Sequence, residues 1–235
     1  MKFDFKVDKF VVALNIIERK LIDLEFENYL SKSFTKDYNK IINRDCDYLQ
    51  DLFKLPIIKE TLKYKDFDKI FKECKENSVR IKQNWGKYKQ EIEEFLNIKC
   101  KTKLPDLDLT VYIVPWGGHS FVGSNSLIWG HKKGYKDKFY DLVYLYHEAL
   151  HHLFKLNDIS HCLIEKLTDN MLAKHFHPEL INGYCGHKNL QELSKILEKY
   201  FNLYFNKNSN KFSNMNIFEF EEFLLNNFKN LEVCI

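Results

Sequence analysis

The feature that most constrains the fold is the helical spacing of apolar residues through much of the first hundred positions. One stripe consists of Phe10, Val11, Leu14, Ile17, Leu21 and Leu24, which from Val11 onwards are three or four positions apart. Similar stripes recur in "YNKIINRDCDYLQDLF" and "SVRIKQNWGKYKQEIEEFL". Because this spacing puts apolar side chains on one face of a helix, residues 9–98 are predicted to form several amphipathic helices. Breaks are expected near Ser31 to Ser33, at Pro56 and around Asn77.

Three segments have the character of β-strands instead. "KFDFKVD" alternates apolar and charged residues over positions 2–7, and "LDLTVYIVP" is a β-rich run over 108–114. "SFVGSNSLIWG" follows the glycine-containing turn "WGGH" and is expected to be extended over 120–129. The sequence therefore predicts an α+β, mainly helical fold, in which a small mixed sheet packs on the helix that follows it.

Further helices are predicted after this sheet, and they complete the expected organisation. Their expected bounds are 138–155, 158–176, 189–203 and 216–229. Without an internal repeat or a long low-complexity linker, residues 1–235 are expected to form one compact unit. We expect it to contain a helical subdomain (9–103), a sheet and site core (104–176) and C-terminal helices (177–235).

Composition and charge narrow the classes of function. The net charge is only +3 and lysines alternate with acidic residues, which argues against a nucleic-acid-binding face. The six cysteines are scattered without a CxxC pair, so neither a zinc ribbon nor a disulfide framework is expected. The first residues make a poor signal peptide, and no apolar run approaches the length of a membrane span, so a cytoplasmic protein is expected.

The sequence "HEALH", residues 147–151, fits the HExxH pattern of zinc-binding helices. Histidines four positions apart lie about 40° apart around a helix axis, so His147 and His151 can meet one metal ion. Glu148 would lie close enough to take a proton from a water that the metal activates. Chance alone would produce the pattern in a fraction of roughly 0.03 of such chains. The residues around the motif must therefore show whether it forms a metal site.

The next predicted helix offers a third ligand. A loop through "KLNDIS" and a returning helix would bring Glu165 back towards the two histidines. The resulting His, His, Glu set leaves one coordination position open, as catalytic zinc sites do. Asp169, one turn further on, faces the same way and can accept a hydrogen bond from the second ring nitrogen of a ligand histidine.

HExxH followed by ExxxD on the next helix resembles the gluzincin zinc metallopeptidases, over about residues 108–176. The resemblance implies a zincin-like fold, Zn²⁺ as the cofactor, and a peptide or protein as the substrate. It further implies that His147, His151 and Glu165 bind the metal, that Glu148 is the general base, and that Asp169 supports the first histidine.

The resemblance also implies how a substrate would bind. In that clan an edge strand of the sheet holds an extended peptide, and "SFVGSNSLIWG", with the small polar residues Ser124, Asn125 and Ser126, is similar in placement. Tyr184 and His187, in the glycine-flanked loop "NGYCGHK", are candidate donors to the oxyanion of the transition state.

Several alternatives stay open at this point. An inactive or non-peptidase zincin-like module that acts through protein–protein interaction would show the same motif. Endopeptidase, aminopeptidase and carboxypeptidase modes, the identity of the substrate and the oligomeric state are likewise left open. A basic helical nucleic-acid binder would need a clustered cationic face that the interleaved charges do not supply.

Overall fold

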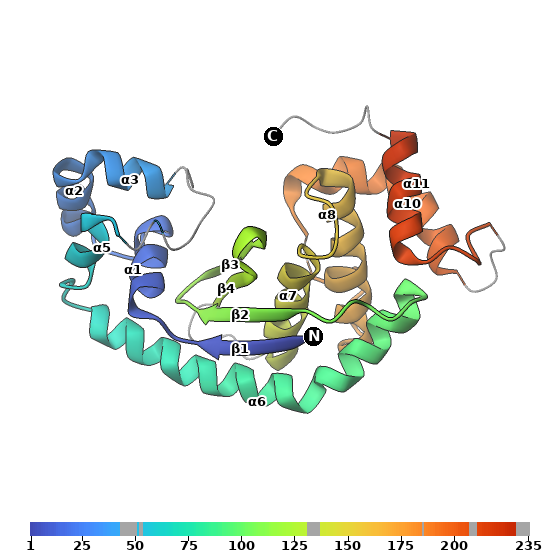
Figure 1. Ribbon diagram of the computed structural model, residues 1–235, viewed down its shortest axis with the longest axis horizontal. Coiled ribbons are helices and arrows are strands. Elements are labelled where there is room, and N and C mark those ends of the chain that lie inside the picture. Colours follow the sequence, from blue (N-terminus) through green and yellow to red (C-terminus); the bar gives the residue numbers. More distant parts are fainter. Residues whose placement is uncertain (43–50, 52–53, 131–136, 185, 207–210, 229–235) are drawn as a thin grey trace. The chain divides into compact units, whose positions relative to one another are not determined.

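The computed structural model describes residues 1–42, 51, 54–130, 137–184, 186–206 and 211–228. The chain divides into two compact units (Figure 1). We call one the sheet unit (Lys2–Asn84 and Leu107–Asp141) and the other the helical unit (Met1, Trp85–Asp106 and Leu142–Ile235). The units are interleaved along the chain.

The sheet unit contains four strands with the order β1-β2-β4-β3. The strands are β1 (Lys2–Lys6), β2 (Asp108–Ile113), β3 (Gly117–Phe121) and β4 (Ser126–Gly130). β1 pairs parallel to β2, β2 pairs parallel to β4, and β3 pairs antiparallel to β4. Figure 1 shows β1 and β2 side by side and pointing the same way. The prediction of a small mixed sheet in a mainly helical α+β fold is therefore confirmed.

The predicted substrate-binding edge strand is wrong in its position. β4 lies inside the sheet between β2 and β3, and all five of its residues are buried. Ser126 begins this strand, Asn125 is a turn residue with a left-handed backbone (φ 45°), and Ser124 ends the 3₁₀ turn η1 (Val122–Ser124). The apolar run "LIWG" is buried between two neighbouring strands, as a continuous apolar strand requires. The sheet's edges are β1 and β3.

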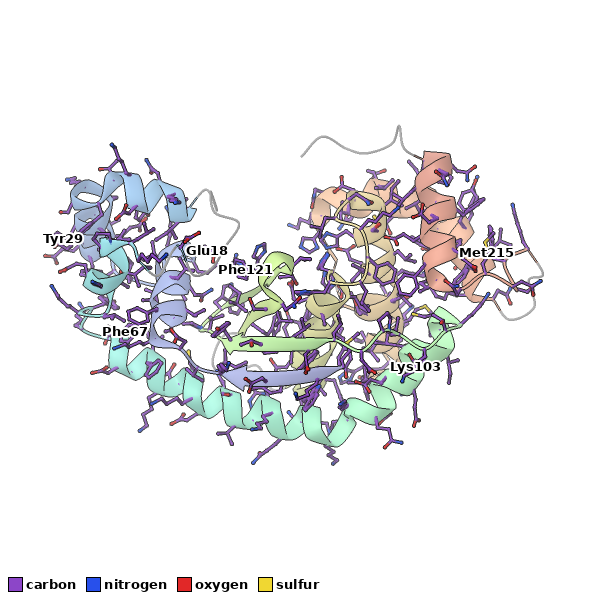
Figure 2. The ribbon with its side chains drawn as sticks, viewed as in Figure 1. Glu18, Tyr29, Phe67, Lys103, Phe121 and Met215 are labelled. Carbon is purple, nitrogen blue, oxygen red and sulfur yellow. The ribbon has the colours of Figure 1, made fainter. Side chains whose placement is uncertain are left out.

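Among the described residues, four short helices accompany the sheet in this unit. They are α1 (Lys9–Glu18), α2 (Leu24–Ser33), α3 (Thr35–Ile42) and α5 (Pro56–Thr61). Asp8 caps α1 by accepting from the backbone N–H of Phe10 and Val11, and Asp23 caps α2 in the same way. Pro56 is the first residue of α5, where its missing N–H costs nothing. Tyr29, labelled in Figure 2, lies partly exposed on α2.

Two long helices run from one unit into the other, which explains why the units are interleaved. α6 (Phe67–Cys100) continues through Asn77, where a break was expected. α7 (Lys138–Leu150) begins in the sheet unit, where buried Asp141 accepts from the Trp129 indole at 2.9 Å and pairs with Arg80 at 2.7 Å. Within the described residues, none of the helices combines the length and apolar character needed to cross a membrane.

The helical unit is built from the ends of α6 and α7 and from the helices that follow. These are α8 (Asp158–Glu165), the π-helix η2 (Lys166–Leu172), α9 (Ala173–Phe176), the 3₁₀ turn η3 (Lys188–Leu190), α10 (Gln191–Phe205) and α11 (Ile217–Phe228). Its core is rich in aromatic residues, as predicted: Tyr204 stacks on Phe220 at 4.2 Å between ring centroids, and both are buried. The cysteines were predicted to be free and buried. The structure confirms this for Cys74, Cys100 and Cys162, and the others lie outside the described residues.

Candidate metal centre

The HExxH residues lie at the C-terminal end of α7. His147 is buried, with 2% of its surface exposed, while His151 is the first residue after the helix. The helix ends at Leu150 and not near Lys155 as predicted, because the chain tightens there: His152 N–H donates to Ala149 and Leu153 N–H to Leu150. The rings of His147 and His151 still lie together, 5.2 Å apart between centroids.

A third histidine joins them, and the sequence reasoning missed it. His161 on α8 has its ring 5.2 Å from His147 and 4.7 Å from His151. One ligand atom from each of these three residues lies within 4.8 Å of the others, close enough for the three to hold one metal ion. The signal in the sequence was the spacing of His161 and Glu165, four positions apart and so on one face of the same helix.

The ring of His161 has the properties of a metal ligand. Its Nε2 atom is buried and has no hydrogen-bond partner among the described residues. Burial, together with the neighbouring His147, His151 and His187, lowers the pKa of His161 to about 3. The imidazole is therefore neutral at physiological pH and offers a lone pair, which is the form that binds a metal. An unpartnered buried nitrogen is costly unless a ligand occupies it.

Asp169 lies where the sequence placed it, against His147. The Nδ1 atom of His147 is 2.9 Å from Asp169 Oδ1, and both side chains are at most 3% exposed. Burial alone would lower the pKa of His147, but the Asp169 carboxylate overrides it and raises the pKa to about 9. This pair stabilises positive charge on the ring, so Nε2 would have to release its proton to bind a cation, while Nδ1 stays directed at Asp169.

Thr168, also buried, supports this pair from the neighbouring position. Its hydroxyl lies 2.8 Å from the Ile164 carbonyl and 3.0 Å from Asp169 Oδ1, so it can donate to either. Both Thr168 and Asp169 belong to the π-helix η2, which the sequence did not predict. Single π-helical turns inside longer helices are frequent at functional sites.

Glu165 belongs to a second, overlapping group of possible ligands. Its carboxylate, with His161 and His187, offers ligand atoms within 4.8 Å of one another. Glu165 Oε1 accepts from the His187 backbone N–H at 2.6 Å and lies 2.7 Å from His187 Nδ1. The hydrogen bond to Glu165 is the largest cause of the raised pKa of His187. Among the described residues, Glu165 thus groups with His161 and His187 and not with the two HExxH histidines.

The loop that carries Tyr184 and His187 is held tightly against this part of the helical unit. Tyr184 N–H donates to the Asp169 carbonyl at 2.7 Å, and Gly183 has a left-handed backbone (φ +73°). A Cβ atom on Gly186 would lie 2.4 Å from Glu165 Oε2, so a larger residue there would require the Glu165 carboxylate to shift. A polar cavity of ≈ 520 Å³ borders the loop and is lined in part by Glu165, Tyr184 and His187.

Glu148 is half-buried on α7 beside His147. Its carboxylate is one of the charges that raise the pKa of His147. Its predicted role as a general base stays a prediction, as do the roles of Tyr184 and His187 as donors to a transition state.

Comparisons with protein-family models, curated proteins and solved structures returned no match for this chain. The functional argument therefore depends on the site itself. In the part of the chain that the structure describes, two groups of side chains could hold a metal ion: His147, His151 and His161, and His161, Glu165 and His187. Both include His161, so this residue is central to any metal that binds here.

Proposed function

We propose that the protein is a zinc-dependent metallopeptidase whose metal is held by His147, His151 and His161. The observation that carries the proposal is the convergence of ligand atoms from these three imidazoles within 4.8 Å, with the buried His161 Nε2 making no hydrogen bond among the described residues. Three imidazole ligands suit zinc and leave one position open for chemistry, and binding would displace the Nε2 proton that the raised pKa of His147 favours. The proposal keeps the predicted histidine pair but replaces Glu165 with His161 as the third ligand.

Bound zinc would polarise a substrate carbonyl and lower the pKa of a water molecule at the site. In this account, Glu148 takes the proton from the attacking water and passes it to the leaving amine of a peptide or protein substrate. Asp169 holds His147 in the tautomer that presents Nε2, through the 2.9 Å contact at Nδ1. Tyr184 and His187 are the candidates to donate hydrogen bonds to the oxyanion.

A second candidate is a zincin-like metal-binding module that does not cleave peptides and acts through a protein partner. The observation that favours it is the second ligand group, because His187 and Glu165 lie next to His161. If one of these side chains joined the three histidines on the metal, protein atoms would fill all four positions. A closed site of that kind is structural and not catalytic.

Zinc content and peptide cleavage, measured on the same preparations, separate the two candidates. We expect the wild-type protein to cleave members of a mixed peptide library. We expect Glu148→Gln to retain zinc and lose most turnover, because the amide is nearly isosteric but cannot accept the proton. Glu222→Gln makes the same chemical change at an exposed position and serves as the control. A zinc-loaded wild type with no cleavage would favour the module, and full turnover by Glu148→Gln would remove Glu148 from the mechanism.

A further inference from the structure

Glu221 on α11 is a buried carboxyl group for which the proposed chemistry has no use. Only 4% of its surface is exposed. Its Oε1 atom accepts two hydrogen bonds, from the Lys155 backbone N–H at 2.9 Å and from the Ser160 hydroxyl at 2.5 Å. Burying a carboxyl group is costly unless it is hydrogen-bonded, so both contacts are needed to keep it there.

One donor lies within the connection between α7 and α8, and the other lies in the first turn of α8. Lys155 follows His151 by four positions, and Ser160 immediately precedes His161. Residues 151–157 form turns and bends without a regular helix or strand, so repeating backbone hydrogen bonds do not fix their path. Asn157 caps α8 by accepting from Ser160 N–H at 2.9 Å, but this contact fixes only the start of that helix.

We propose that Glu221 is a positioning residue for the metal centre and sets the separation of His151 and His161. One oxygen atom joins the segment after His151 to the segment before His161, so movement of either segment would stretch one of its hydrogen bonds. Metal ligands must be held within about 0.5 Å of their working geometry, and residues outside the ligand set provide that precision. The inference rests on the metal site proposed above.

The next residue along α11 provides a matched control. Glu222 pairs with the Lys155 ammonium group, and the two side chains are 53% and 54% exposed. Exposed ion pairs of this kind contribute little to stability. Glu221 and Glu222 therefore contact the same lysine, one at its buried backbone and the other at its solvated side chain.

The first test is the zinc dissociation constant, measured by competition with a chromophoric chelator. We expect Glu221→Ala to weaken zinc binding by about tenfold or more, in the range found for residues that support metal ligands. Glu221→Gln keeps an oxygen that can accept both hydrogen bonds and should stay near the wild-type value, as should Glu222→Ala. Leu224→Ala, at a fully buried position of the same helix, should lower the melting temperature and leave zinc affinity unchanged.

A second variant and a metal-independent measurement keep the inference testable. If Glu221→Ala does not fold, Ser160→Ala removes one of the two donors and should still weaken zinc binding several-fold. In metal-free protein, Glu221→Ala or Ser160→Ala should speed hydrogen exchange at the Lys155 amide, and Glu222→Ala should not. Wild-type zinc affinity in a folded variant would overturn the inference. Failure of the wild type to bind zinc would instead overturn the proposed metal site, and amide exchange would still report on the contact.

Discussion

Removing the Asp169 carboxylate should weaken zinc binding by an amount that follows from its contacts. Asp169 Oδ1 is the acceptor for His147 Nδ1 at 2.9 Å and lies 3.0 Å from the Thr168 hydroxyl. In Asp169→Ala the Thr168 hydroxyl can still donate to the Ile164 carbonyl at 2.8 Å, whereas the His147 N–H loses its short contact and keeps only the Thr168 oxygen, at 3.4 Å, within reach among the described residues. A buried donor without an acceptor costs about 1–3 kcal/mol.

This cost falls on the zinc-bound state. With zinc on Nε2, His147 must keep its proton on Nδ1, whereas in the metal-free variant the proton can move to Nε2. A cost of about 1–3 kcal/mol corresponds to roughly 5- to 150-fold weaker binding. Asp169→Asn should lose less, because the amide oxygen can still accept from Nδ1 although the negative charge is gone.

The assay is zinc competition with a chelator at neutral pH, with circular dichroism to confirm that each variant is folded. Glu198→Gln is the control, because it neutralises a carboxylate whose partner is Lys166 and which makes no contact with the imidazoles in the described contacts. A folded Asp169→Ala variant with wild-type zinc affinity would refute the reasoning that this contact supports a metal ligand.

Two further predictions concern the surroundings of the histidines, and a third concerns a buried thiol. His161→Ala should reduce zinc affinity much more than Glu165→Ala, as measured by chelator competition, because His161 belongs to both ligand groups; the reverse order would restore Glu165 as the third ligand. In metal-free protein Glu165→Gln should lower the pKa of His187, followed by NMR, because Glu165 is what raises it; an unchanged pKa would contradict this contact. Burial raises the pKa of Cys100 to about 12, so peptide mapping should find it unmodified by alkylating reagents until the protein unfolds.

The helices were predictable where their apolar stripes were long and their ends were marked. α10 and α11 begin and end within two residues of the expected bounds. The break expected at Asn77 did not occur, because one residue of poor helix propensity costs less than about 0.7 kcal/mol of helix stability. The long helix α6 remains stable despite this cost. The π-helix was invisible in the sequence, since its pattern of residues does not differ from that of an ordinary helix.

For the sheet, the sequence predicted which segments are extended but not which strands lie at its edges. The run "SLIWG" was correctly predicted to be extended, but its apolar character on both faces indicates a central strand and not an exposed edge. The glycines at 117 and 118, expected to form a turn, begin β3 instead. Which strand lies at an edge depends on pairing between distant segments, and the spacing of residues within one segment does not encode it.

For the site, the sequence predicted the contact between His147 and Asp169, but it did not predict that His161 would lie beside His147 and His151. The contact between His147 and Asp169 follows from helical spacing on two helices that fold back on each other. The choice between His161 and Glu165 depends on how far the second helix is shifted along the first. The connection at residues 151–157 and its hydrogen bonds to Glu221 set that shift, so it involves a residue sixty positions from His161.

The most direct test of the metal centre is the zinc content of purified wild-type protein and of a variant that carries both His147→Ala and His151→Ala. The account predicts about one zinc per chain in the wild type and little in the double variant, because two of its three ligands are gone. The variant should be shown to be folded by circular dichroism before its metal is measured. Equal zinc in the two folded proteins would contradict the account.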